Sequence, residues 1–464
     1  MEEKALRDEL FYQQKHGYDL IGLEERLKLE AYCEDYKAFL DAARTEREAV
    51  REAVRQAEEA GFVPLRPGME LAPGAKVYKS IRGKALILAV IGRRSLTDGA
   101  NIAAAHVDSP RLDLKQLPLF ENSELCYFKT HYYGGIKKYQ WLTIPLELHG
   151  VVTKKDGETI DVVIGRDSED PKFVITDLLP HLGKDQMSKT AGEFVNGEDL
   201  SLLIGSIPYA DEGKDRVKLA VISLLNDRYG ITEEDFLSAE LEAVPSFEVC
   251  DVGLDRSLIG GYGHDDRVCA YTELKAIYEL EAPERTAVCI LADKEEVGSM
   301  GVSGMQSRAF ECFMEELCEI QGVRMRQCME NSFCVSADVC NGFDPLYAEV
   351  CENPNRNGAK VNYGMGICKY TGVRGKGGSN DASAEVVGVL RRIFADNGVV
   401  WQMAELGKVD QGGGGTVALY MANRNIDTID AGVPVLSMHS PWETVAKFDC
   451  YMTYKGILSF YKDR

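Results

Sequence analysis

Several short apolar runs in this chain end in a carboxylate or a histidine. The run "NIAAAH" ends at His106, "TAVCILADKEE" leads into Glu295 and Glu296, "FCVSAD" ends at Asp338, and "GVPVLSMH" ends at His439. Each residue alone has an ordinary structural explanation, but solvated charge does not normally follow one apolar strand after another. Because α/β sheets commonly place their sites at the carboxyl ends of strands, the pattern predicts an α/β fold with these side chains at one edge of a sheet.

The distribution of helical and strand-like segments predicts a domain interrupted by an insertion. Residues 20–60 show apolar residues at helical spacing, and short β-rich runs follow them. Residues 116–245 look like antiparallel strands, after which helices and strands alternate again. We therefore predict an α/β catalytic domain, with a mixed sheet and helices on both faces, from residues 1–115 and 246–464. Residues 116–245 would form an inserted, mainly β domain.

Local signals predict where some of these elements begin. Thr45 and Glu48 have the spacing of a capping box at the start of a helix. The run "VKLAVISLL" at 217–225 predicts a strand of the inserted domain. The run "SNDASAEVVGVLRRIFADNG" predicts a helix that begins at Ser379 or Asn380.

The composition argues against several classes of partner. The 464 residues carry a formal net charge of −21, which disfavours nucleic acid or an anionic membrane as the main partner. No apolar run approaches the roughly 18 residues of a membrane helix, and the N-terminal sequence has no signal-peptide pattern. The 13 cysteines form no CxxC pair, which is typical of reduced, buried thiols in a cytoplasmic protein.

The candidate side chains have the chemistry of a divalent-metal site. Two imidazoles and several carboxylates, without a thiolate, suit Zn²⁺, Co²⁺ or Mn²⁺. Two such ions need a carboxylate between them, and Asp265, in the glycine-rich "GGYGHDD" turn before a helix, is the natural bridging residue. Successive side chains at a strand end diverge, so one of Glu295 and Glu296 could bind metal while the other serves as general base.

The order of these motifs resembles that of the M18 family of metallo-aminopeptidases, which includes aspartyl aminopeptidase and aminopeptidase I. The M42 tetrahedral aminopeptidases are more distant relatives. The resemblance covers nearly the whole chain and rests on the segments "AAHVDSPRLDLK", "GHDDRVCAY", "DKEEVGSMG", "SADVCNG" and "DAGVPVLSMHS". It implies a zinc-type aminopeptidase with two divalent metal ions per subunit, which hydrolyses the N-terminal residue from peptides with a free N-terminus through a metal-bridged water.

The resemblance also assigns the metal ligands. His106, Asp265 and Asp338 would hold one ion, and Asp265, Glu296 and His439 would hold the other. Asp265 is therefore shared.

Two residues would act beside the ions. By the same resemblance, Glu295 is the catalytic general base and then the general acid. Asp108 would orient His106, as metal-bound histidines commonly require. His264 is not a ligand by this alignment.

Contacts with the substrate and with other subunits follow from the resemblance less directly. His131, in "FKTHYYGG", is similar to a family histidine that reaches an active site, sometimes that of a neighbouring subunit. Lys360, in "NGAKVNYG", lies near a family lysine position and is a second candidate substrate contact. The inserted domain supplies subunit contacts in relatives, so we expect it to be an oligomerisation or lid domain of a homo-oligomer, as large as a dodecamer. The choice between acidic and neutral N-terminal residues stays open.

Three other functions are compatible with parts of this pattern. A metal-dependent deacylase or amidase would use the same ligands, but it would prefer N-acetylated substrates that an aminopeptidase rejects. A glycosidase that uses Glu295 and another carboxylate leaves His106 and His439 without a role. A non-enzymatic metal-binding scaffold would be expected to lack a ligand or the base, and this sequence contains all of them.

Overall fold

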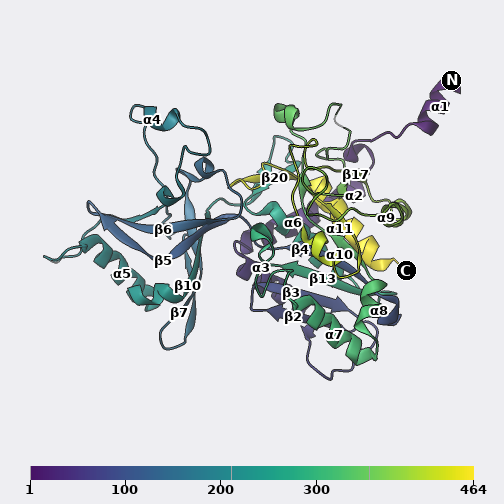
Figure 1. Ribbon diagram of the computed structural model, residues 1–464, viewed down its shortest axis with the longest axis horizontal. Coiled ribbons are helices and arrows are strands. Elements are labelled where there is room, and N and C mark those ends of the chain that lie inside the picture. The colour runs from purple at the N-terminus through teal and green to yellow at the C-terminus, as the bar shows by residue number, and fades with distance from the viewer. Residues whose placement is uncertain (1, 211, 355, 464) are drawn as a thin grey trace.

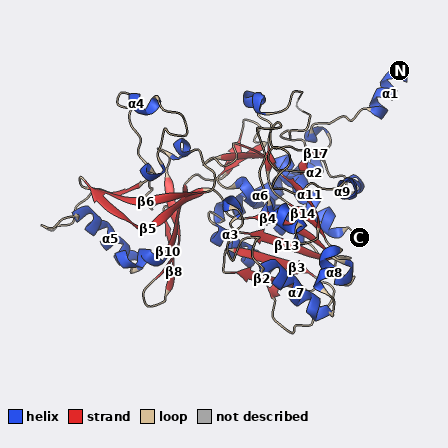
Figure 2. Cartoon of the chain, viewed as in Figure 1, coloured by secondary structure: helices blue, strands red, loops and turns tan. Residues whose placement is uncertain are grey.

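The chain forms an α/β body and a smaller β-rich body beside it (Figure 1, Figure 2). The computed structural model describes residues 2–210, 212–354 and 356–463. The N-terminal helix α1 (Glu2–Leu10) projects away from the α/β body in Figure 1, whereas the C-terminal end lies on that body.

The α/β body contains a nine-stranded mixed sheet in the order β1-β2-β3-β13-β4-β14-β18-β16-β17. These strands, in that order, are Val63–Pro64, Lys76–Ile81, Ala85–Val90, Thr286–Ala292, Ala100–His106, Phe333–Ser336, Asp427–Gly432, Met365–Cys368 and Trp401–Met403. The central strands β13, β4, β14 and β18 are parallel. The register pairs Ala292 with His106 and Ser336 with Ala104, so the carboxyl ends of β13, β4 and β14 meet at one edge.

Helices cover both faces of this sheet, as the sequence predicts. Alternate residues of β3 belong to different apolar cores: Leu86 and Leu88 face one core, whereas Ile87 and Ala89 face the other. The first core is completed by α2 (Leu23–Ala42), α3 (Glu46–Glu59), α6 (His264–Tyr278), α9 (Ala384–Asp396) and α11 (Lys447–Lys462). The second is completed by α7 (Ala309–Gln321), α8 (Met325–Glu330) and α10 (Val417–Ala422). None of the helices within the described ranges is both long enough and apolar enough to cross a bilayer.

The β-rich body contains a six-stranded antiparallel sheet, here called the inserted sheet, in the order β8-β7-β10-β5-β6-β9. These strands are Thr159–Ile164, Leu146–Thr153, Ala239–Pro245, Arg111–Asn122, Leu125–Tyr133 and Leu202–Gly205. The body also contains α4 (Lys184–Met187) and α5 (Arg216–Tyr229), and it has its own apolar core.

A third, five-stranded sheet lies in the α/β body. Its strands, in order, are β11 (Cys250–Val252), β12 (Leu258–Gly261), β20 (Glu443–Ala446), β19 (Pro434–Leu436) and β15 (Cys340–Asn341).

Two of the local predictions are wrong. The run at 217–225 is not a strand but the first part of α5, where Val217, Val221 and Leu225 pack into the core of the β-rich body at helical spacing. Helix α9 begins at Ala384 because the Ser383 hydroxyl, rather than Ser379 or Asn380, caps it by accepting the Val386 N–H at 3.3 Å. The capping box of Thr45 and Glu48 is confirmed at the start of α3.

Candidate metal centre

The structure brings the predicted ligands together at the carboxyl edge of the nine-stranded sheet, which His439 reaches from β19 of the five-stranded sheet. His106 ends β4, and Asp338 follows β14 two residues after its end. Ligand atoms of His106, Asp265 and Glu296 lie within 4.8 Å of one another, and so do those of His106, Asp266 and Asp338. The resemblance assigns Asp265 as a ligand and not its neighbour Asp266.

Asp265 lies between the two imidazoles. Its Oδ1 is 3.2 Å from Nε2 of His106, and its Oδ2 is 3.1 Å from Nε2 of His439. The same His439 nitrogen is 3.4 Å from Oε1 of Glu296. The two oxygens of one buried carboxylate therefore face two different histidines, which is the arrangement expected of a bridging ligand.

The backbone around Asp265 is held by contacts that the sequence did not reveal. Gly263, with φ at +80°, allows the tight turn into α6. Buried Glu443 accepts hydrogen bonds from the N–H of Asp265 at 3.0 Å and from the N–H of His439 at 2.7 Å. The Ser109 hydroxyl donates to the carbonyl of Asp265 at 2.6 Å. Glu443 thus fixes Asp265 and the His439 backbone relative to each other.

Both imidazoles present Nε2 to the site. Nδ1 of His439 lies 2.8 Å from the carbonyl oxygen of Gly135, and Nδ1 of His106 lies 3.0 Å from the carbonyl oxygen of Asp108. A carbonyl only accepts, so each Nδ1 carries a proton and donates it, and Nε2 is the nitrogen that faces the site and could bind a cation. Burial lowers the pKa of His439, but Asp265 and Glu296 more than offset this and raise it to about 10. Without a cation this ring therefore also holds a proton at Nε2, which a bound cation would replace.

Asp108 contacts more of the site than the predicted orientation of His106 requires. Its Oδ1 lies 3.4 Å from Nδ1 of His106 and accepts the Glu295 N–H at 3.1 Å. Its Oδ2 accepts the Glu296 N–H at 3.2 Å and the Tyr133 hydroxyl at 2.8 Å. One buried carboxylate therefore holds an imidazole and both glutamates.

Several buried carboxyl groups of the site have raised pKa values, because their ionised forms are not fully stabilised by the surrounding protein. Burial raises the pKa of Glu295 to about 7, with Asp108 and Asp265 adding to the effect. Burial and Asp265 raise the pKa of Glu296, and burial and Asp266 raise that of Asp338. Oε1 of Glu296 and Oδ1 of Asp266 are buried without a hydrogen-bond partner in the described part of the chain. Cations would relieve this concentration of carboxylates.

The remaining predicted residues lie outside this cluster. His131 is exposed on β6 and lines a separate cavity of about 640 Å³ together with Lys84 and Lys294. The Nζ atom of Lys360 lies 5.4 Å from the ring centre of Tyr363. Lys360 is not among the described residues that line the cavity beside His439.

His264 has a structural environment. It is fully buried, and its Nδ1 lies 2.6 Å from the Tyr36 hydroxyl. Burial lowers the pKa of His264 to about 3, which keeps the ring neutral.

A cavity of about 670 Å³ opens beside His439 and is large enough for part of a peptide. Lys137, Asp344, Leu436 and Met438 are among its lining residues, so charges of both signs and apolar surface face it. Lys137 was not singled out from the sequence.

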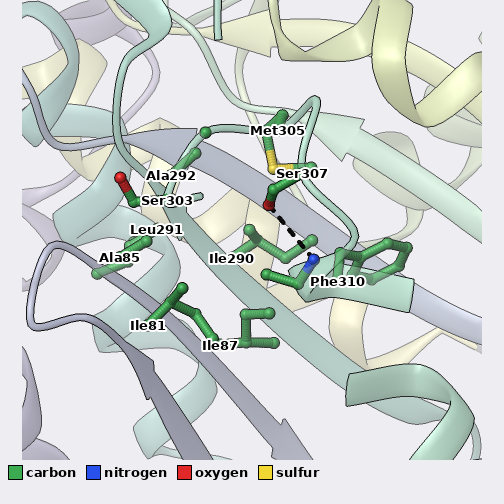
Figure 3. A pocket seen from close by; sticks show the side chains of 12 residues that line it. Ile81, Ala85, Ile87, Ile290, Leu291, Ala292, Ser303, Met305, Ser307 and Phe310 are labelled. Carbon is green, nitrogen blue, oxygen red and sulfur yellow. Dashed lines mark hydrogen bonds between the residues drawn. The ribbon is translucent and has the colours of Figure 1, made fainter. Parts of the chain in front are cut away.

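A much smaller pocket than these two cavities lies beside β13. Figure 3 shows its apolar lining, which includes Ile87, Ile290 and Phe310, and the Ser307 hydroxyl accepting the Ala309 N–H at 3.3 Å. Its volume of about 10 Å³ leaves space for little more than one water molecule. It is therefore a packing gap between the loop after Glu296 and the sheet, and it is too small for a substrate.

Comparison with known families decides the class of this centre. Residues 39–461 match the family model described as aminopeptidase I zinc metalloprotease (M18). The chain belongs to the M18 family. The predicted family is thereby confirmed, and as an M18 member the chain is a hydrolase of the metallo-aminopeptidase class with a divalent-metal site.

Bacterial M18 relatives match along nearly the whole chain. A probable M18 family aminopeptidase 1 of Clostridium acetobutylicum is 46% identical over 462 residues, which cover 98% of this chain and 99% of the relative. One from Thermotoga maritima is 47% identical over 432 residues, covering 92% and 94%.

Solved M18 structures share the fold. The crystal structure of the Thermotoga maritima M18 aminopeptidase has a TM-score of 0.93 at 44% identity and covers 98% of this chain and 100% of that chain. Yeast mApe1, described as a dodecamer, has a TM-score of 0.75 at 18% identity, covers 94% of this chain and 97% of that chain, and shows likeness of fold alone. The predicted α/β fold class is confirmed.

Proposed function

We propose that the chain is a di-metal aminopeptidase that removes the N-terminal residue from peptides, with Glu295 as general base. The observation that carries the proposal is the position of Asp265, whose two carboxylate oxygens face the Nε2 atoms of His106 and His439.

The donor set fits zinc. Two imidazole Nε2 atoms, several buried carboxylates and Oε1 of Glu296, which accepts no hydrogen bond within the described ranges, are ligands that Zn²⁺, Co²⁺ or Mn²⁺ accept. One ion would be held by His106, Asp265 and Asp338, and the other by Asp265, Glu296 and His439. When bound, the cations supply Lewis-acid polarisation of a carbonyl oxygen and make water in the site more acidic.

Glu295 is placed to move protons. Its Oε2 lies 3.9 Å from Nε2 of His106, at the edge of the ligand cluster, and its backbone is fixed by Asp108. Without cations, burial raises its pKa to about 7. A carboxylate in this position can accept a proton and later donate it. Glu295 would take a proton from the attacking water and deliver it to the leaving amine.

The substrate would occupy the cavity beside His439. Because both Lys137 and Asp344 line this cavity, its charge does not by itself select an acidic or a neutral N-terminal residue. The free α-amine of the peptide would lie near the carboxylates, and this restricts cleavage to the first peptide bond.

A substrate panel tests the proposal against the deacylase alternative. We expect aminoacyl p-nitroanilides with a free amine to be hydrolysed and their N-acetylated counterparts to be rejected. Chelation should abolish the activity, and added zinc, cobalt or manganese should restore it. Faster hydrolysis of the acetylated compounds would favour a deacylase, and activity that survives chelation would exclude a metal mechanism.

We further propose that residues 116–245 form an oligomerisation or lid domain of a homo-oligomer. Large apolar side chains are exposed on the β-rich body, among them Leu178, Leu182, Met187 and Ile207. The yeast relative is a dodecamer, which makes the same assembly a reasonable expectation. Light scattering that gives only the monomer mass at assay concentration would contradict it.

A reducing, cytoplasmic location is part of the same proposal. All 13 cysteines are free, and all except Cys250 and Cys312 are buried or covered within the fold.

A further inference from the structure

The segment Tyr133-Gly134-Gly135 leaves the inserted sheet and enters the metal centre. The Tyr133 hydroxyl donates to Oδ2 of Asp108 at 2.8 Å, and the carbonyl of Gly135 accepts from Nδ1 of His439 at 2.8 Å. Between them, Gly134 lies so close to Glu296 that a Cβ added to it would be 3.2 Å from the carboxylate oxygen Oε2. Three consecutive residues therefore contact groups that serve both proposed ions.

The ring of Tyr133 is fixed in place. It is 8% exposed, with the Arg111 guanidinium 3.9 Å and the Lys294 ammonium 5.4 Å from its ring centre. Arg111 is itself held by Glu46 at 3.3 Å and by Glu242 at 3.2 Å. The hydroxyl can therefore reach Asp108 without ordering a mobile side chain.

The hydroxyl acts on the carboxylate that positions both glutamates. Oδ2 of Asp108 has two donors, the Tyr133 hydroxyl and the Glu296 N–H, whereas Oδ1 accepts the Glu295 N–H. Hydrogen bonds to an ionised carboxylate are among the strong ones in proteins. Without the hydroxyl, Asp108 would keep only the donors from the Glu295–Glu296 turn and could shift together with that turn. Even a small displacement of a catalytic group such as Glu295 lowers the reaction rate strongly.

We propose that Tyr133 is a positioning residue that acts through Asp108, and that the Tyr133–Gly135 segment couples packing of the β-rich body to the geometry of the metal centre. The inference rests on the proposed function of this centre. It assigns a role to the inserted sheet that is separate from contacts between subunits.

The test is Tyr133→Phe with Tyr78→Phe as a matched control. Tyr78 is also 8% exposed and also donates to a carboxylate, that of Glu58, at 2.7 Å, but it lies on β2 outside the centre. We expect Tyr133→Phe to lower kcat about tenfold or more while KM changes by less than about threefold, because loss of such an outer partner typically costs 10–100-fold. Zinc affinity, measured by competition with a chromophoric chelator, should fall as well. The control should lose a similar amount of thermal stability and change neither quantity.

A double-mutant cycle with Asp108→Asn tests the route. If Tyr133 acts through Asp108, Tyr133→Phe should add little to the loss of kcat and zinc affinity already caused by Asp108→Asn. Fully additive losses of these two quantities would overturn the proposal. So would changes in kcat and zinc affinity no larger than those of Tyr78→Phe. If the wild-type chain lacked aminopeptidase activity, the proposed function would fail, and the zinc titration would still decide the role of Tyr133.

Discussion

Replacing Glu295 by glutamine separates proton transfer from metal binding. Glutamine keeps the size of the side chain, and the hydrogen bond from residue 295 to Asp108 comes from the backbone and is retained. Because the amide cannot accept the proton of an attacking water, we expect turnover to fall by roughly 10²–10⁴-fold. Metal analysis should find the wild-type content, because Glu295 is not among the proposed ligands.

The same substitution should stabilise the metal-free protein, by an amount that depends on pH. Burial raises the pKa of Glu295 from 4.5 to about 7, and its side chain is only 17% exposed. The folded state then disfavours the ionised form of Glu295, and its ionisation lowers the free energy of unfolding. This loss is absent below about pH 4, grows between pH 4.5 and 7, and is constant above that range. At about 1.4 kcal/mol per pKa unit, the loss removed by glutamine is about 3 kcal/mol at pH 8 and less than about 1 kcal/mol at pH 5.

Thermal unfolding of chelator-treated protein at the two pH values measures this difference. An unfolding entropy of about 2 cal/mol/K per residue gives about 1 kcal/mol/K for a chain of this length, so the variant should melt about 3 °C higher at pH 8 and about 1 °C higher at pH 5. Glu315→Gln, at an exposed position of α7, is the control and should show neither effect. Equal melting differences at the two pH values would refute the burial argument, and unchanged turnover in the metal-replete variant would remove Glu295 from its role as base.

Three further predictions concern the ligands and the fold. His106→Ala and His439→Ala should each lower the bound metal measured after dialysis, and full occupancy in both variants would refute the ligand assignment. Asp265→Asn should weaken the binding of both ions rather than of one, because the two carboxylate oxygens face different histidines. Loss of only one bound ion in metal analysis would contradict a bridging role. Ser383→Ala should lower the unfolding free energy by about 1 kcal/mol through loss of the α9 cap, whereas Ser379→Ala should have a smaller effect; the reverse order in denaturant titrations would contradict the observed helix start.

The sequence predicted the elements that are recognisable from local patterns. The strands β3, β4 and β13 are buried along their whole length, so their apolar runs and the polar residues that follow them were informative. The run at 217–225 was misread because nine mostly apolar residues fit either a strand or a helix. Only packing of Val217, Val221 and Leu225 into one core distinguishes the two.

The candidate site was predictable to the extent that its residues lie in recognisable motifs. His106, Glu296 and Asp338 gather because the parallel strands β4, β13 and β14 end at one edge, which the order of elements already implies. Asp265 comes from the first turn of α6, and His439 follows β19 of the five-stranded sheet.

The roles of Glu443, Tyr133 and Gly135 were not predictable, because each includes a contact with a residue 25 to 304 positions away. No local pattern of charge or spacing distinguishes such partners from other buried residues.

The position of the insertion explains how these distant partners reach the centre. The inserted sheet begins at Arg111, a few residues after His106, and its last strand ends at Pro245, before the turn that carries Asp265. The chain therefore leaves the α/β body at one proposed ligand and returns near another. A sheet attached in this way extends β6 back over the site at little cost in chain length, which allows Tyr133 to contact Asp108 and Gly135 to contact His439. The contacts of Tyr133 with Asp108 and of Gly135 with His439 thus form only when the two bodies are packed together.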